Sequence, residues 1–244
     1  MVQKVIGILG GMGPQATLYL FEKIIRNTPA KCDQDHLRVI IDNNPKVPDR
    51  TRAILENGEN PVPMMVKGAQ TLIQAGADFI LIPCISAHYF LDELNRKLSR
   101  PILSAFDAVA KRIVGDHPDI KTVGLLATNG TIQGGCFQKR LTKSGIQTQM
   151  PGEPYQRHIM SAIYEIKGDP TGLAHTENKT AIKLVAEHLI QNGCQGIIAG
   201  CTEIPLVLSP KDIDVPLFNP LLILAEAAIQ EAKQVVPSCG GGPV

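Results

Sequence analysis

Apolar residues follow two alternating patterns along the chain. Short runs rich in aliphatic residues are typical of buried strands, and the stretches between them carry apolar residues at the spacing of an amphipathic helix. The predicted strands are Val5 to Leu9, Val39 to Asp42, Phe79 to Ile82, Thr122 to Leu126 and Gly196 to Ala199, and the predicted helices are Ala16 to Arg26, Met64 to Ala75, Phe106 to Val114 and Thr180 to Asn192. This alternation predicts an α/β fold with parallel sheets flanked by helices.

The two halves of the chain are similar to each other at one fixed offset. The stretch VIGILGGMG from Val5 resembles TVGLLATNG from Thr122, and LIQAGADFILIPC from Leu72 resembles LIQNGCQGIIAGC from Leu189. Both pairs are offset by 117 residues without a gap. Agreement of two separate segments on one offset favours an internal duplication over chance similarity.

The duplication predicts how the chain divides into lobes. We expect a first α/β lobe formed by residues 1–103 and a C-terminal helix at about 218–235, and a second lobe formed by residues 104–217. An approximate twofold axis would relate the lobes and place the active site in the cleft between them. The glycine-rich segment 236–244 is expected to be a flexible tail.

Cys84 and Cys201 take equivalent places in the two copies, each just after a predicted strand. Ligands of parallel sheets bind at the carboxyl ends of the strands, so the two thiols are expected to face each other across the cleft. The positive end of a following helix would favour a thiolate there. One thiolate and one thiol on opposite sides of a carbon can remove a proton and return another on the other face.

A nucleophilic hydrolase is a weaker alternative for the same cysteine. His88 follows Cys84 by four residues and could share a helical face with it as a general base. A buried histidine that serves packing or hydrogen bonding is the more common case. We therefore expect a structural role for His88.

Two further segments predict contacts with an anionic ligand. The glycine turns at Gly10 to Pro14 and Ala127 to Thr131 follow the first strand of each copy, and their N–H groups could hold a carboxylate. Their glycine spacing does not fit a dinucleotide fingerprint. The polar loop NNPKVPDRTRA contains Arg50 and Arg52, and the planar guanidinium of Arg50 could bind an acidic side chain in two places at once.

Composition and net charge limit the kinds of binding partner that we expect for this chain. The 244 residues include 24 basic and 23 acidic ones, a net charge of +1, which gives no reason to expect nucleic acid or a membrane surface as a partner. The N-terminal apolar run is too short for a signal peptide, so we expect a cytoplasmic protein whose six cysteines are reduced. No Cys-x-x-Cys motif and no Cys/His pair at zinc-ligand spacing occurs, so no metal site is expected.

The ordered set of motifs resembles the aspartate/glutamate racemase family of cofactor-independent amino-acid racemases. The likeness covers nearly the whole chain and is carried by the segments IGILGGMGPQAT, NNPKVPDRT, FILIPCISAHY, LLATNGTI, IYEIKGD and IIAGCTEIP. It implies a homodimer of two-lobed subunits that racemises an acidic amino acid, aspartate ahead of glutamate, without a cofactor.

The resemblance also implies roles for individual residues. Cys84 and Cys201 would be the two acid/base thiols, and Arg50 and Lys167 would bind the side-chain carboxylate. The remaining predicted substrate contacts are Met12, Ile85, Ser86, Thr128, Asn129 and Thr202. Ile85 stands where the family usually has asparagine, which removes an amide that could bind the substrate and leaves the backbone N–H.

Two other functions fit the same residues. Related enzymes of this fold use similarly placed cysteines to isomerise unsaturated diacids or to decarboxylate malonates, and a covalent adduct at one cysteine would identify that chemistry. Ile85 also leaves room for a protein that binds an amino acid without turning it over. Stabilisation by aspartate without exchange of its α-proton would identify such a binding protein.

Overall fold

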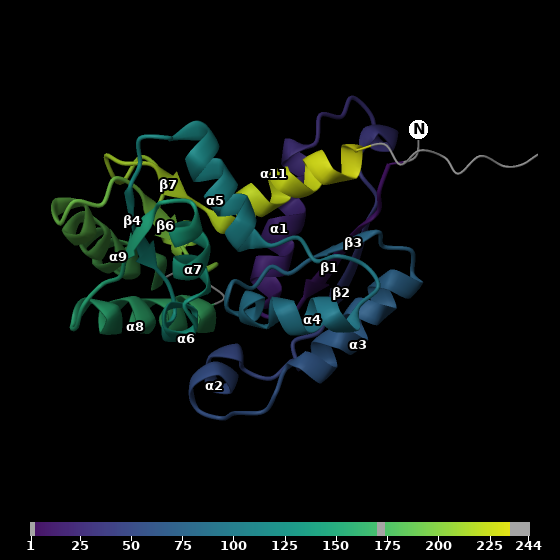
Figure 1. Ribbon diagram of the computed structural model, residues 1–244, viewed down its shortest axis with the longest axis horizontal. Coiled ribbons are helices and arrows are strands. Elements are labelled where there is room, and N and C mark those ends of the chain that lie inside the picture. The colour runs from purple at the N-terminus through teal and green to yellow at the C-terminus, as the bar shows by residue number, and fades with distance from the viewer. Residues whose placement is uncertain (1–2, 170–173, 235–244) are drawn as a thin grey trace, which may run out of the picture.

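The computed structural model describes residues 3–169 and 174–234, which form two parallel sheets with helices around them (Figure 1). The predicted tail at 236–244 lies outside the described residues. The strands are β1 (Ile6–Gly10), β2 (Val39–Asn43), β3 (Phe79–Leu81), β4 (Thr122–Leu126), β5 (Gln147–Gln149), β6 (Ile197–Ala199) and β7 (Leu217–Phe218). The helices are α1 (Pro14–Asn27), η1 (Asp33–Asp35), α2 (Arg50–Leu55), α3 (Val62–Gln74), η2 (Ser86–Phe90), α4 (Leu91–Lys97), α5 (Ala105–Asp116), α6 (Asn129–Gly134), α7 (Cys136–Lys143), α8 (Tyr155–Gly168), α9 (Ala174–Gln191), α10 (Ile204–Val207) and α11 (Pro220–Lys233).

The two sheets repeat the same strand pairing. The first has the order β2-β1-β3 and the second β5-β4-β6-β7, with every pairing parallel. In the first sheet Gly7 pairs with Ile80, and in the second Gly124 pairs with Ile197, so both partners are shifted by the same 117 residues. The α/β fold class and the repeat predicted from the sequence are therefore confirmed at the level of strand register.

The glycine shared by both copies has a steric cause. A Cβ atom on Gly7 would lie 3.4 Å from the Cβ of Leu72 and 2.9 Å from that of Ala77. A Cβ atom on Gly124 would lie 3.3 Å from the Cβ of Leu189, the counterpart of Leu72. Glycine at these two positions lets α3 and α9 pack closely on the central strands β1 and β4.

Helices α5 and α11 lie between the two sheets and join the halves (Figure 1). Helix α5 comes from the first half but packs against α7 of the second, and α11 comes from the second half but packs against α1 of the first. One buried cluster accordingly contains residues from both halves, among them Leu20 and Phe137. These contacts support the predicted assignment of the C-terminal helix to the first lobe, although the lobe boundaries stay a prediction.

Most differences from the predicted elements concern short or polar segments. The five predicted strands are present with ends shifted by at most one residue. The pattern missed β5 and β7, which have three and two residues. It also treated the segment after β2 as a loop, whereas α2 forms there because the Asp49 side chain accepts a hydrogen bond from the Arg52 N–H and caps the helix.

Candidate active site

Cys84 lies where the buried strand β3 ends and the short helix η2 begins. Its side chain is buried, and the His88 Nδ1 lies 3.0 Å from its backbone carbonyl oxygen. The His88 ring also meets Phe106 edge to face. These contacts suit a histidine that fixes the backbone of the loop between β3 and η2.

The His88 ring is a neutral group in this environment. Burial lowers its pKa to about 4, and hydrogen bonding to the backbone of Cys84 and Leu103 opposes this only in part. The geometry therefore gives His88 the structural role that we expected rather than that of a general base beside the thiol.

Cys201 follows β6 in the second half and has a carboxylate at its sulfur. Its Sγ donates a hydrogen bond to Oε2 of Glu203 over 2.9 Å, and the Thr202 hydroxyl donates to the same oxygen over 2.9 Å. Burial raises the pKa of the Cys201 thiol well above its ordinary value, and repulsion by Glu203 raises it further. Cys201 is therefore a thiol at neutral pH.

Lys167, near the end of α8, is electrostatically linked to both cysteines. Its Nζ lies 3.9 Å from Oε1 of Glu203. Burial acts to lower its pKa, but the negative charges of Cys201, Glu203 and Cys84 outweigh burial and raise the pKa. Lys167 is thus an ammonium ion that interacts electrostatically with both cysteines.

A small cavity lies beside Cys84 at the junction of the two halves. It is lined by Asp49, Arg50, Thr51, Cys84, Ser86, Thr128, Ile163, Tyr164 and Lys167. Its volume of about 20 Å³ is enough for about one water molecule. An amino acid can therefore enter only when the surrounding walls move apart.

The two terminal nitrogens of Arg50 make hydrogen bonds that hold the guanidinium in place, whereas its Nε makes none among the described residues. Its Nη1 donates to the carbonyl oxygens of Val47 and Pro48 over 3.0 and 2.8 Å, and its Nη2 donates to that of Met12 over 3.4 Å. Its Nε is buried and has no hydrogen-bond partner among the described residues. An orphaned donor on a cavity-lining guanidinium is suited to a carboxylate ligand.

Three hydroxyl groups join the halves beside Cys84. Ser86 Oγ lies 3.1 Å from Thr128 Oγ1 and 2.9 Å from Thr131 Oγ1, and the two threonine hydroxyls are 3.1 Å apart. The Thr128 hydroxyl also accepts the Thr131 N–H and caps α6. These contacts bring Ser86 and Thr128, two predicted substrate contacts from different halves, to one wall of the cavity.

The other predicted contacts lie outside the cavity lining. Met12 is buried and reaches the site through its carbonyl oxygen on Arg50. Asn129 accepts a hydrogen bond from Gln156 over 2.8 Å. Cys201 and Thr202 meet the site through Glu203, which pairs with Lys167.

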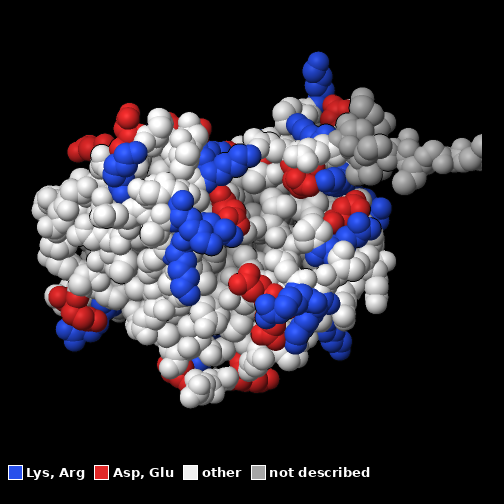
Figure 2. All heavy atoms as spheres, viewed as in Figure 1, with Lys and Arg blue, Asp and Glu red and all other residues white. Residues whose placement is uncertain are grey.

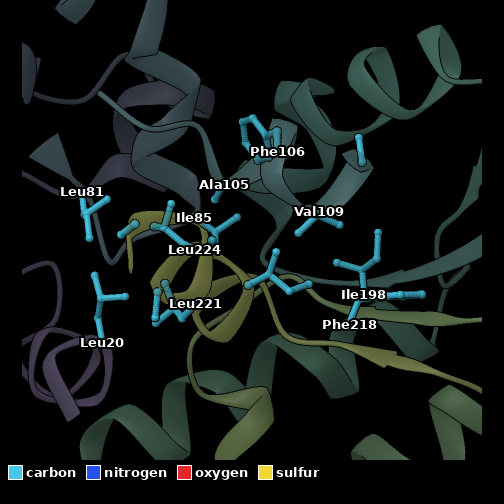
Figure 3. Close-up of a cluster of buried hydrophobic side chains, with 14 of the residues drawn as sticks. Leu20, Leu81, Ile85, Ala105, Phe106, Val109, Ile198, Phe218, Leu221 and Leu224 are labelled. Carbon is cyan, nitrogen blue, oxygen red and sulfur yellow. The ribbon is translucent and has the colours of Figure 1, made fainter. Parts of the chain in front are cut away.

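The Ile85 side chain points into the protein core. It is buried in the cluster shared by the two halves, near Ala105, Leu221 and Leu224 (Figure 3). Its side chain therefore serves packing, and only its backbone N–H remains available to a ligand. Ile85 is not among the residues that line the cavity, so isoleucine in place of the family's asparagine leaves no gap in the cavity wall.

Several residues at the site escaped the sequence reasoning. Asp49, Thr51, Ile163 and Tyr164 line the cavity but were not predicted. Tyr164 precedes Lys167 by one helical turn, so a helix assigned to IYEIKGD would have placed both side chains on one face. Glu203 was not predicted either, because its hydrogen bond to the Cys201 thiol depends on the turn after β6.

The surface carries no large area of one charge on the face shown in Figure 2, where acidic and basic side chains are interspersed. Within residues 3–169 and 174–234, no helix has both the length and the apolar composition needed to cross a membrane.

Comparisons with known proteins show the family and the fold to which this chain is similar. The family model described as Asp/Glu/Hydantoin racemase matches residues 9–228. The broad specificity amino-acid racemase RacX of Bacillus subtilis is 30% identical over 230 residues, which are 92% of this chain and 96% of RacX. An aspartate racemase from Picrophilus torridus has a TM-score of 0.80 at 32% identity and covers 94% of each chain.

A more distant structure shares the fold. Glutamate racemase from Francisella tularensis, solved with D-glutamate, has a TM-score of 0.66 at 18% identity, over 93% of this chain and 80% of that one. The family match and the RacX identity together define the class of protein. The chain belongs to the Asp/Glu/hydantoin racemase family. It is an isomerase, an amino-acid racemase.

Proposed function

We propose that the protein racemises an acidic amino acid, aspartate in preference to glutamate, by a two-thiol mechanism without a cofactor. The observation that carries this proposal is the equivalent placement of Cys84 and Cys201 after β3 and β6, with Lys167 electrostatically linked to both. A histidine-assisted hydrolase is disfavoured because the His88 Nδ1 contacts the Cys84 carbonyl oxygen.

The proposed direction of proton transfer follows from the protonation of Cys201. Because Cys201 is a thiol at neutral pH, Cys84 as thiolate would remove the α-proton, and Cys201 would deliver its proton to the opposite face of Cα. Cys84 then holds the substrate's former proton and Cys201 is the thiolate. The reverse reaction, or exchange of protons with water, restores the starting state.

Arg50 supports the assignment of an acidic substrate. Arg50 lines the cavity and its buried Nε has no partner among the described residues, so this guanidinium can donate to the side-chain carboxylate, while Ser86 and Thr128 are placed to bind the substrate's polar groups. Lys167 was predicted as a second carboxylate ligand, but Glu203 already partners its ammonium ion. We therefore assign the carboxylate to Arg50 first.

Incubation with single enantiomers in heavy water tests this function. We expect D- and L-aspartate to interconvert and to gain deuterium at Cα, with glutamate slower and neutral amino acids slower still. Cys84→Ala and Cys201→Ala should each lower racemisation about 10²- to 10⁴-fold, the usual contribution of a general acid or base. Cys194→Ala is the matched control, since Cys194 is a buried thiol that faces Gln149. Racemisation at close to the wild-type rate in either site variant would exclude the two-thiol mechanism.

The panel also separates the rival functions. A neutral amino acid that turns over as fast as aspartate would remove the acidic preference and keep the racemase. Tight aspartate binding without α-proton exchange would favour a binding protein. We further propose a cytoplasmic homodimer, which sedimentation of the purified protein tests through its mass.

A further inference from the structure

We propose that Lys167 acts on the thiol of Cys201 through Glu203, as the cation that makes the thiolate form of Cys201 accessible. This inference deepens the proposed racemase, because it concerns the proton chemistry of the same site. It gives Lys167 a role in proton transfer to all substrates rather than in recognition of an acidic side chain.

The contacts form a continuous chain from the lysine to the sulfur. Lys167 Nζ lies 3.9 Å from Oε1 of Glu203, and Oε2 of the same carboxylate accepts the Cys201 Sγ–H over 2.9 Å. The Thr202 hydroxyl donates to Oε2 over 2.9 Å and fixes the carboxylate. Both oxygens of Glu203 thus have partners, and the carboxylate holds the thiol and the ammonium ion at its two ends.

The carboxylate and the thiol of this chain are buried, whereas the Lys167 side chain, 37% exposed, reaches them from the surface. Glu203 and Cys201 are 8% and 7% exposed, so a thiolate on Cys201 would put two negative charges side by side away from water. Lys167 is the cation in contact with this carboxylate, and its charge lowers the pKa of Cys201 against the effects of burial and Glu203. The thiolate therefore depends on Lys167.

The other charged groups near the site do not replace Lys167. Arg50 faces the same cavity, but its guanidinium donates to the carbonyl oxygens of Val47, Pro48 and Met12. Asp49 also lines the cavity, and its Oδ1 accepts the Arg52 N–H over 2.8 Å. Cys84 acts on Lys167 as a further negative charge. Among the described residues, Lys167 is thus the ammonium ion that interacts with both thiols.

Both directions of racemisation would depend on this cation. In one direction Cys201 starts as the thiolate, and in the other it becomes the thiolate when it gives up its proton. Because two enantiomers have equal free energy, kcat/KM must be equal in the two directions. Loss of Lys167 should therefore slow both directions alike, for acidic and neutral amino acids.

A titration without substrate tests the proposal directly. The thiolate of Cys201 is followed by ultraviolet absorbance, as the difference between each protein and the same protein carrying Cys201→Ser. Lys167→Met should move the midpoint of the Cys201 titration to higher pH by about one unit, a tenfold change in proton affinity. Lys167→Arg should leave the midpoint near its original pH.

Two further variants test whether the shift of the Cys201 midpoint could come from the loss of any lysine or from a weakened fold. Lys97→Met removes a lysine that pairs with Glu93 over 3.0 Å on α4, and it should leave the midpoint unchanged. Adding Glu203→Gln to Lys167→Met should move the midpoint back to lower pH, because it removes the negative charge that the lysine offsets. A lysine that only supports the fold would not give this reversal.

Kinetics then distinguish the two roles of Lys167. We expect Lys167→Met to lower kcat/KM by a similar factor for aspartate and for the fastest neutral substrate. An unchanged Cys201 midpoint, or a loss confined to aspartate, would overturn the proposal and return Lys167 to carboxylate binding. The titration needs no turnover, so it tests the role of Lys167 even if the protein proves not to racemise aspartate.

Discussion

The two halves of the protein share strand register but differ in the residues around their cysteines. The register repeats at 117 residues, and both cysteines follow the strand that pairs with the central one. Cys84 is followed by Ile85 in the core and by His88 on its carbonyl oxygen. Cys201 is followed by Thr202 and Glu203, which place a carboxylate at its sulfur.

This difference bears on the proposed two-thiol mechanism, because it gives the two cysteines of a repeated scaffold different surroundings. The repeated strands place the two cysteines equivalently, whereas the residues after each strand differ. Burial and Glu203 hold Cys201 as the thiol. A two-base racemase needs this inequality at rest, since one sulfur must accept a proton while the other supplies one.

The largest predicted difference between the halves is the pH dependence that His88 gives to the free energy of unfolding. Its pKa is lowered from 6.5 to about 4 in the folded protein, so the unfolded chain binds the proton first as the pH falls. The stabilisation is complete above pH 6.5 and is lost towards pH 4, with a size of about 3 kcal/mol. Urea unfolding across this range should show the loss in the wild type.

His88→Gln is the control for that measurement. It should remove this part of the pH dependence, because glutamine does not titrate. The equivalent position of the second half is Pro205, whose side chain does not titrate. This pH dependence of stability should therefore come from the first half alone. Equal pH slopes for the wild type and His88→Gln would show that His88 is not the group responsible.

Gly11→Ala and Thr128→Ala compare equivalent positions in the two turns after β1 and β4. Gly11 has a φ of +91°, and a Cβ there would lie 2.2 Å from the Asn44 carbonyl carbon. We expect Gly11→Ala to cost about 2 kcal/mol. Thr128 has an extended backbone and caps α6, so its replacement should cost about 1 kcal/mol. Chemical denaturation checks both, and a larger loss for Thr128→Ala would contradict the ranking.

Glu203→Gln probes the asymmetry at the second cysteine alone. Removal of the charge that repels the Cys201 thiolate should lower the Cys201 titration midpoint by about one unit, a tenfold change. The same difference absorbance that reports on Cys201 measures the shift. Glu165→Gln is a matched control on α8, because Glu165 hydrogen-bonds to Ser161 and Asn178 instead. A shift of equal size in the control would assign the effect to net charge.

Sequence reasoning reached the parts of the fold that depend on periodicity. Buried apolar strands such as β1 and the repeated glycines and cysteines are visible in the chain because close packing allows few alternatives. Strand β5, with the sequence QTQ, has no apolar pattern and pairs only because Thr122 to Gly124 lie beside it. Its existence depends on tertiary context.

The site was predicted less completely than the fold. Cys84 and Cys201 could be found from the repeat, and Lys167 came from the family resemblance alone. The cavity lining by Tyr164 and the contact of α2 with α6 require the two halves to be docked. The ion pair of Glu203 with Lys167 could not be inferred, because Lys167 lies on α8 and only the folded chain brings it to the turn after β6.

The crossing of α5 and α11 makes the two halves depend on each other for folding. Each half covers part of its hydrophobic surface with a helix that the other half supplies. A chain truncated after α5 would leave α1 without α11 and α5 without α7, and the apolar faces of both helices would meet water. Such a chain should therefore fail to stay both monomeric and folded.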